Sequence, residues 1–215
     1  MKYIKILCLV AFVFVLNSCE SDPNEYVVIE TEFGNIDLKL YASTPLHQAN
    51  MLKLVDEGFY DDLLFHRVIS NFMIQGGDPD SRTAAKEARL GNGGPGYTIP
   101  AEIGAPHFRG ALSAARLSDN QNPNRESSGS QFYIVTGMAW DDSKMDNWEN
   151  VNKLTYTPEQ RELYKTIGGR PDLDGKYTVF GEVTAGMDVV DKIANAPKDM
   201  FDRPIENIAF KIRRK

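Results

Sequence analysis

Short runs of apolar residues, separated by turn-forming residues, predict that this chain is mostly β-structure. Residues 26–33 and 36–41 are rich in β-branched and aromatic residues with rough alternation of apolar and polar positions, which is typical of paired strands. Gly34-Asn35 lies between them and is a two-residue turn signal. We therefore expect the folded part to open with a β-hairpin.

The rest of the chain repeats this pattern and adds two helical segments. Thr44 and Pro45 begin a helical pattern that ends at Gly58, and apolar residues recur on one side of a second helix at 187–194. Two helices and about eight strands fit a closed barrel with a helix over each end. The further expected strands lie at residues 65–69, 72–74, 111–115, 131–135, 177–183 and 208–212.

Residues 137–170 differ in character from the segments around them. Thr157 and Gln160 fit a capping box that begins a helix. We expect an inserted loop with its own helix. Its tryptophans, Trp140 and Trp148, either pack locally against the barrel or form a docking surface for a partner in the cell envelope. The sequence leaves both alternatives open.

The first residues carry the pattern of an export signal. Lys2 and Lys5 precede an apolar run at 6–16 that is too short to span a bilayer comfortably. The run ends in Leu-Asn-Ser-Cys, which resembles a bacterial lipoprotein cleavage box with Cys19 as the lipid attachment site. A plain secretory signal, in which Cys19 is incidental, is the alternative.

The predicted organisation follows from this N-terminus. We expect a lipoprotein signal peptide at 1–18, a lipidated Cys19 with an acidic tether to residue 25, and a folded domain at 26–215. Such a protein is exported and held by its lipid on a membrane of a Gram-negative cell envelope, in the periplasm or facing the surface.

Composition and charge exclude several other classes of protein. The chain has 215 residues, of which 42% are hydrophobic and 25% are charged, as expected for one globular domain. From Cys19 onward there are 24 − 2 = 22 basic and 30 acidic residues, a net charge of −8, which argues against nucleic acid as a partner. The only other cysteine is Cys8, so no disulfide can form within the expected domain.

Some patterns resemble cofactor or metal sites but favour other interpretations. Residues 91–96 match G-x-G-x-x-G, yet no strand closely precedes them and Pro95 within the motif does not suit the first turns of a following helix, so we expect a flexible glycine loop. His47, His66 and His107 have no cysteine or carboxylate at metal-ligand spacing. The sequence therefore predicts neither a cofactor nor a metal.

Two further patterns are weak candidates for catalysis. Ser130 lacks the G-x-S-x-G elbow of serine hydrolases, which leaves hydrolysis as a minor alternative. Asp78 and Asp80 flank a proline, a pattern that favours a turn over an acid–base pair.

A longer motif indicates a family. Residues 65–79 read FHRVISNFMIQGGDP, which closely resembles the cyclophilin signature of F-H-R, two aliphatics, two turn residues and F-M-x-Q-G-G-D. Three more segments, at 110–116, 129–134 and 177–183, are similar to other family segments in the same order. The resemblance extends from residue 26 to the C-terminus, except for residues 137–170.

This resemblance to cyclophilin-type peptidyl-prolyl cis-trans isomerases implies a fold and an activity. The fold is a closed eight-stranded antiparallel barrel capped by two helices, and its outer groove binds proline-containing polypeptides without a cofactor. We expect a monomeric isomerase that assists the folding of exported proteins. The alternative from another class is a binding module or chaperone that uses the same groove without turnover.

The resemblance also implies roles for individual residues. Arg67 takes the position of the catalytic arginine, whose guanidinium can stabilise the twisted X-Pro bond. The residues that form the floor of the proline pocket are Phe72, Met73, Tyr133 and Leu173. Those that contact the substrate backbone are Gln75, Ala115, Arg116 and Gln131. Tyr177 replaces the usual histidine at the rim, and Asp172 falls at or near a position often held by tryptophan, which argues against tight cyclosporin binding.

Overall fold

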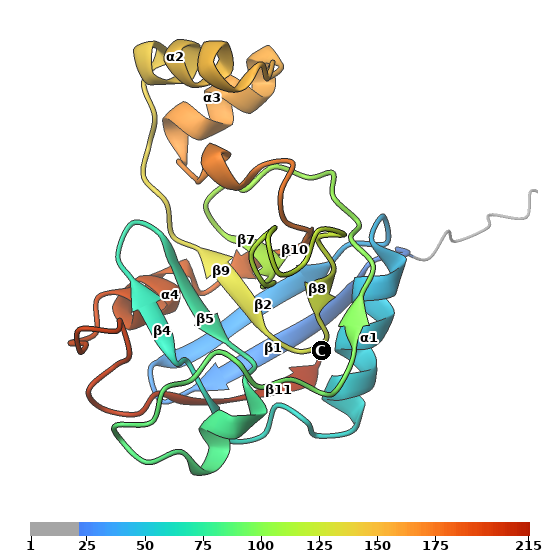
Figure 1. The fold of residues 1–215 in the computed structure, drawn as a ribbon, viewed down its shortest axis with the longest axis vertical. Coiled ribbons are helices and arrows are strands. Elements are labelled where there is room, and N and C mark those ends of the chain that lie inside the picture. Colours follow the sequence, from blue (N-terminus) through green and yellow to red (C-terminus); the bar gives the residue numbers. More distant parts are fainter. Residues whose placement is uncertain (1–21) are drawn as a thin grey trace, which may run out of the picture.

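The computed structural model describes residues 22–215 and consists mainly of antiparallel β-structure (Figure 1). The predicted signal peptide and the predicted lipid attachment site, Cys19, lie outside the described residues. The strands are β1 (Glu25–Thr31), β2 (Gly34–Leu40), β3 (Leu63–Leu64), β4 (Arg67–Ile69), β5 (Met73–Gly76), β6 (Thr98–Ile99), β7 (Ala111–Ala114), β8 (Ser127–Ser128), β9 (Phe132–Val135), β10 (Val179–Ala185) and β11 (Ala209–Arg214). The α-helices are α1 (Pro45–Asp56), α2 (Asp142–Asn152), α3 (Pro158–Thr166) and α4 (Met187–Ala194), and two 3-10 helices span Pro79–Thr83 and Pro171–Leu173.

Nine of these strands form one curled sheet in the order β3-β11-β1-β2-β10-β7-β9-β5-β4, and β6 and β8 form a separate pair. The main core lies inside the curl, where the apolar faces of α1 and α4 pack on it. Figure 1 shows these two helices at opposite ends of the sheet. The predicted helices at α1 and α4 are confirmed.

The prediction of a closed eight-stranded barrel is wrong, because the sheet is an open half-barrel of nine strands. Its edge strands, β3 and β4, are successive parts of one chain segment. Phe65 N donates to Ile208 O at 3.0 Å, on the β11 side, whereas His66 N donates to Gln75 O at 3.0 Å, on the β5 side. The segment changes partners between these residues and cannot pair with itself, so no ladder joins the two edges.

The predicted hairpin of β1 and β2 forms, but its turn lies two residues earlier than Gly34-Asn35. Thr31 pairs with Gly34, so Glu32 and Phe33 make the turn. The register places Ile29 opposite Ile36, and both side chains are fully buried. A turn at Gly34-Asn35 would shift the pairing by four positions and keep apolar residues on the same face, so the alternation of apolar and polar residues alone does not distinguish the two registers.

The N-terminus of α1 is capped by a residue from outside the helix. Thr44 was the expected cap, but its hydroxyl donates to Tyr41 O and makes no capping bond. Glu102 instead accepts hydrogen bonds from Leu46 N at 3.1 Å and His47 N at 3.0 Å. A carboxylate there satisfies two free N–H groups and lies at the positive end of the helix dipole.

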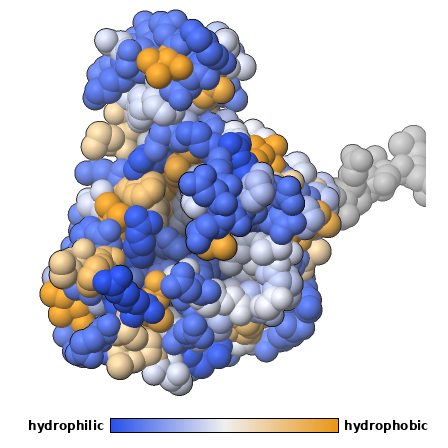
Figure 2. All heavy atoms as spheres, viewed as in Figure 1, coloured by the Kyte–Doolittle hydropathy of each residue, from blue (hydrophilic) through white to orange (hydrophobic). Residues whose placement is uncertain are grey.

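The insert at 137–170 contains two helices and stands away from the sheet (Figure 1). The predicted helix is α3, and its capping box between Thr157 and Gln160 is present. The second helix, α2, was not predicted; it begins at Asp141, whose carboxylate accepts from Lys144 N. Its mostly polar sequence lacks the apolar periodicity that marks a buried helix. Figure 2 shows that hydrophilic residues cover most of the visible face of this region.

Close backbone contacts at Gly169 hold the insert to the rest of the domain. Gly169 forms isolated β-bridges with both Phe108 and Met138. A Cβ at Gly169 would lie 2.4 Å from His107 O, so only glycine fits. The two ends of the insert are thus fastened at one point next to β9. Within residues 22–215, none of the helices has the length and hydrophobicity to cross a membrane.

Candidate active site

A cavity of about 120 Å³ lies on the sheet face opposite the main core. It brings together nine of the ten residues that the sequence predicted for substrate binding and catalysis: Arg67, Phe72, Met73, Gln75, Ala115, Arg116, Tyr133, Leu173 and Tyr177. They come from β4, β5, β9, the end of β7 and the segment after the insert. Residues more than 100 positions apart in the chain therefore share one recess.

The strand register explains this convergence. Arg67 pairs with Gln75 across β4 and β5, and Gln75 pairs with Tyr133 across β5 and β9. Side chains that pair across antiparallel strands lie on the same face. One row therefore presents a guanidinium, an amide and an aromatic ring side by side.

The floor of the cavity is apolar and well packed. Met73 is 1% exposed and Tyr133 is 5% exposed, and both belong to a second apolar cluster that includes Phe72, Leu173 and Tyr177. Burial raises the pKa of Tyr133 well above its usual range, so its hydroxyl stays protonated. Such a recess can enclose a small apolar ring.

Arg67 lies at the mouth of the cavity, and its guanidinium is free. Its side chain is 40% exposed, and Nε is 4.0 Å from the Asp202 carboxylate. Cζ lies 5.6 Å from the centre of the Phe72 ring. Among residues 22–215, no acceptor takes a hydrogen bond from this side chain, so its five donors can serve a bound molecule.

Arg116 is used differently from Arg67. Its side chain is only 4% exposed, and it donates to the main-chain oxygens of Lys176 and Leu117, both at 2.8 Å. Cζ lies 4.5 Å from the Tyr177 ring centre. Its donors are occupied, so Arg116 holds the Tyr177 wall of the cavity in place.

The sequence did not predict Arg170, which covers the other side of Phe72. Its Cζ lies 4.0 Å from the centre of that ring, and its guanidinium donates to both oxygens of Asp172, at 2.7 and 2.6 Å. An ion pair therefore lies where the resemblance implies a tryptophan. Nothing in the local pattern identifies Arg170, because it reaches Phe72 only through the fold of the insert.

Gln131 is the one predicted site residue outside the cavity, although it contacts its edge. Its side chain accepts from Gln75 Nε2 at 3.1 Å and donates to Gly93 O at 2.7 Å. The second bond fastens the predicted glycine loop beside the site. Asp78, which is fully buried, accepts from Gly91 N at 2.5 Å. This carboxylate shapes the loop, in agreement with the expected turn and not with an acid–base pair.

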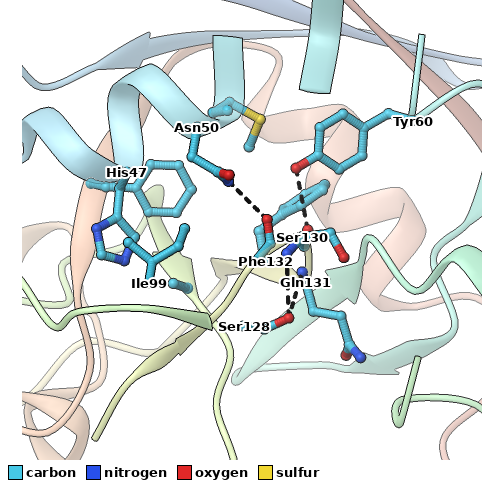
Figure 3. Close-up of a pocket in the computed structure, with 12 residues that line it drawn as sticks. His47, Asn50, Tyr60, Ile99, Ser128, Ser130, Gln131 and Phe132 are labelled. Atoms are coloured by element: carbon cyan, nitrogen blue, oxygen red, sulfur yellow. Dashed lines mark hydrogen bonds between the residues drawn. The ribbon is translucent and has the colours of Figure 1, made fainter. Parts of the chain in front are cut away.

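The segment before β9 is held from the α1 side, as Figure 3 shows. Asn50 Nδ2 donates to Gly129 O at 2.8 Å, and Tyr60 OH donates to Ser130 O at 3.3 Å. The crevice among these residues holds only about 10 Å³, roughly one water molecule. The Ser130 hydroxyl donates to Gly77 O at 2.7 Å. It is buried and used structurally, which contradicts the hydrolase alternative.

The two tryptophans of the insert contact each other. Trp140 and Trp148 are half-buried, with ring centres 6.1 Å apart in an edge-to-face arrangement. This contact lies within the insert, so it decides neither for packing against the barrel nor for a docking surface. Across the described residues, no three His, Cys, Asp or Glu side chains gather to hold a metal ion.

The site is an apolar recess on a curled antiparallel sheet, beside an arginine that has no hydrogen-bond acceptor among the described residues, and the comparisons agree with it. The family model described as cyclophilin type peptidyl-prolyl cis-trans isomerase/CLD matches residues 26–214. The chain therefore belongs to this family and is a peptidyl-prolyl cis-trans isomerase. The family and the enzyme class predicted from the sequence are confirmed.

Individual relatives of the chain are also described as peptidyl-prolyl cis-trans isomerases. A Brucella suis protein described as a peptidyl-prolyl cis-trans isomerase is 36% identical over 185 residues, which are 83% of this chain and 76% of that protein. A Streptococcus pyogenes protein described as a bifunctional phosphatase/peptidyl-prolyl cis-trans isomerase is 33% identical over 199 residues, 88% of this chain. The chain spans only 38% of that longer protein.

A solved structure has the same fold. It is a cyclophilin type peptidyl-prolyl cis-trans isomerase from Cryptosporidium parvum in the presence of the dipeptide Ala-Pro, with a TM-score of 0.64 and 28% sequence identity. The match covers 89% of this chain and 99% of that one.

His66, next to Arg67, yields a prediction about stability and pH. Burial lowers its pKa to about 4, and the nearby Asp78 opposes this shift only in part. The unfolded state takes up the proton first as the pH falls, so folding stability is lost between about pH 6.5 and 4. As the pH falls through this window, the free energy of unfolding of the wild type should decrease by up to roughly 3 kcal/mol because of His66. His66→Phe lacks this titration and should not show that decrease.

Urea unfolding at a series of pH values measures this difference. Carboxylates contribute equally to both curves and cancel in the subtraction. Parallel curves for the two proteins would show that His66 does not titrate in this way.

Proposed function

We propose that this protein isomerises X-Pro bonds through Arg67 while the apolar cavity holds the proline ring. The observation that supports this most directly is a guanidinium without hydrogen-bond acceptors beside a recess formed by Met73, Phe72 and Tyr133. The proposed substrates are proline-containing polypeptides. The Ala-Pro dipeptide present with the related structure supports this class of substrate.

The chemistry of the bond explains why an arginine is needed. Amide resonance imposes a barrier of about 18–20 kcal/mol on rotation. As the bond twists, the lone pair becomes localised on the imide nitrogen, and a donor aimed at it stabilises the twisted state more than either planar state. Arg67 stays charged at all working pH values and has several donors in a rigid fork. Its guanidinium can therefore donate hydrogen bonds both to the substrate carbonyl and to the imide nitrogen.

The cavity and the arginine have separate tasks in this proposal. Burial against Met73 and Leu173 holds the pyrrolidine ring of proline in place. Rotation about the X-Pro bond then moves the carbonyl group of the preceding residue and not the ring. Gln75 lies between Arg67 and Tyr133 in the same row, where its amide can bond the substrate backbone. Ala115, just after β7, also lines the cavity.

We further propose that the protein is a monomeric, exported lipoprotein that assists folding in the envelope of a Gram-negative bacterium. The support is the N-terminal pattern alone, with Cys19 at the end of the signal-like run. An envelope partner at the insert stays a prediction, and the contact between Trp140 and Trp148 does not decide it.

The first prediction concerns the lipid anchor. Mass spectrometry of the native N-terminus should find a mature chain that begins at Cys19 and carries acyl groups. The matched control is Cys19→Ala, which should stay uncleaved at this site and lack the acyl mass. A wild-type product that is cut elsewhere and unmodified would rule out the anchor.

The second prediction concerns turnover. Arg67→Ala should reduce kcat/KM by about a hundredfold to a thousandfold, as the loss of a transition-state donor does elsewhere. A protease-coupled assay on a short Ala-Pro-Phe peptide with the full chain measures this. Arg214→Ala, which breaks exposed pairs with Asp56 and Glu25, is the control and should keep the wild-type rate. Near-normal turnover by folded Arg67→Ala would refute the assigned role.

The third prediction separates the pocket from the core. Phe72 is half-buried between two guanidinium groups, so Phe72→Ala should weaken peptide binding by about tenfold or more while the domain stays folded. Phe132→Ala removes a ring that is 1% exposed in the main core and should cost about 3–5 kcal/mol of stability. Circular dichroism beside peptide titration distinguishes the two. Unfolding of both variants would mean that Phe72 is an ordinary core residue.

A further inference from the structure

A chain of buried hydrogen bonds leads from the floor of the cavity into the insert. Tyr133 OH lies 3.0 Å from His107 Nε2, and His107 Nδ1 lies 2.8 Å from Asp174 Oδ1. His107 is fully buried, and its ring stacks on Tyr133 with an interplanar angle of 11°. None of these contacts was predicted from the sequence.

The other oxygen of Asp174 is held by the insert. Tyr164 OH donates to Oδ2 at 2.5 Å and Tyr156 OH donates to it at 2.9 Å. Tyr164 lies on α3 and is fully buried, and Tyr156 lies just before this helix. The backbone N of His107 donates to Oδ1 at 2.7 Å. With four donors, the half-buried carboxylate is satisfied as an ion.

The donors and acceptors determine where the protons lie. An ionised Asp174 accepts only, so Nδ1 of His107 must carry a proton. When the imidazole is neutral, Nε2 accepts and Tyr133 OH donates to it. This arrangement fixes both the rotation of the Tyr133 hydroxyl and the plane of the His107 ring beneath it.

Two parts of the cavity depend on this network. Tyr133 forms its floor, and Leu173 is the chain neighbour of Asp174 and lines the cavity as well. The insert also bonds the same region through Arg170 N, which donates to His107 O at 2.8 Å. The position of Tyr133 and Leu173 is therefore tied to the insert by directional bonds in addition to packing.

We propose that His107 and Asp174 are positioning residues through which Tyr156 and Tyr164 of the insert set the shape of the proline pocket. The proposal rests on the proposed function of that pocket. The proposal gives the insert a role in substrate binding. Side chains that directional bonds already hold in place lose less conformational entropy when the pocket encloses proline. Arg67 lies outside the network, so kcat should depend on Arg67 and change little when the network is disturbed.

The test removes the two insert hydroxyls and keeps their rings. Tyr156→Phe combined with Tyr164→Phe should raise KM for an Ala-Pro-Phe peptide by about five- to tenfold, with kcat within about twofold of wild type. Tyr133→Phe, which breaks the network at the cavity end, should change KM in the same direction. Tyr26→Phe is the matched control, since it removes a tyrosine–aspartate bond of 2.7 Å to Asp22 far from the cavity; it should leave both constants unchanged.

A purely structural role predicts a different result. The melting temperature would then fall, while the folded variants kept the wild-type KM, and that outcome would overturn the proposal. If the double variant fails to fold, Tyr156→Phe alone decides, because it removes one Asp174 donor from a half-buried ring outside the cavity. Peptide affinity is measured by titration as well, so wild type that binds without turnover would refute the proposed function and still test the network.

A spectroscopic measurement addresses the same network without activity. The imidazole ¹⁵N shifts of His107 in the full chain should show the proton on Nδ1 at neutral pH, the less common tautomer of a free histidine. In the double tyrosine variant, Asp174 loses two donors and its bond to His107 should change, which shifts the Nδ1 resonance. A proton on Nε2 in the wild type would contradict the arrangement.

Discussion

The register between β4, β5 and β9 is the constraint on which the rest of the structure depends. On the inner face, Val68, Ile74 and Ile134 pair in one row and are fully buried. The next row lies on the outer face and consists of Arg67, Gln75 and Tyr133. A slip of one residue would exchange the two faces and bury the arginine, so the hydrophobic core itself determines which side chains reach the cavity.

Three arginine side chains lie around this row, and their hydrogen-bond partners give each a different role. Arg116 is buried with its donors occupied, and Arg170 is paired with Asp172. Arg67 alone among these three keeps its donors free, since the Asp202 carboxylate is 4.0 Å away. Catalysis by charge placement needs such a group, because a donor that is already bonded must break that bond before it can stabilise a transition state.

The insert changes how the site is supported. Without it, Asp174 would lose both tyrosine donors, and a buried, partly unpaired carboxylate would lie under the pocket, at a considerable cost in free energy. The β-bridges of Gly169 and the tyrosine bonds to Asp174 connect the insert to residues next to the pocket. The insert contacts the rest of the domain mainly at one end, so most of the surface of its helices faces solvent and can be polar (Figure 2).

The sequence by itself determined the family, most strands of the main sheet and the helices α1, α3 and α4, since the segment from Phe65 to Pro79 is a dense local signal and apolar periodicity or capping residues mark these elements. It also indicated nine of the residues that line the cavity. Only the tertiary structure decided that the sheet stays open at β3 and β4, that Glu102 caps α1, and that His107 lies between Tyr133 and Asp174. These features depend on contacts between residues far apart in the chain, which periodicity and local motifs do not encode.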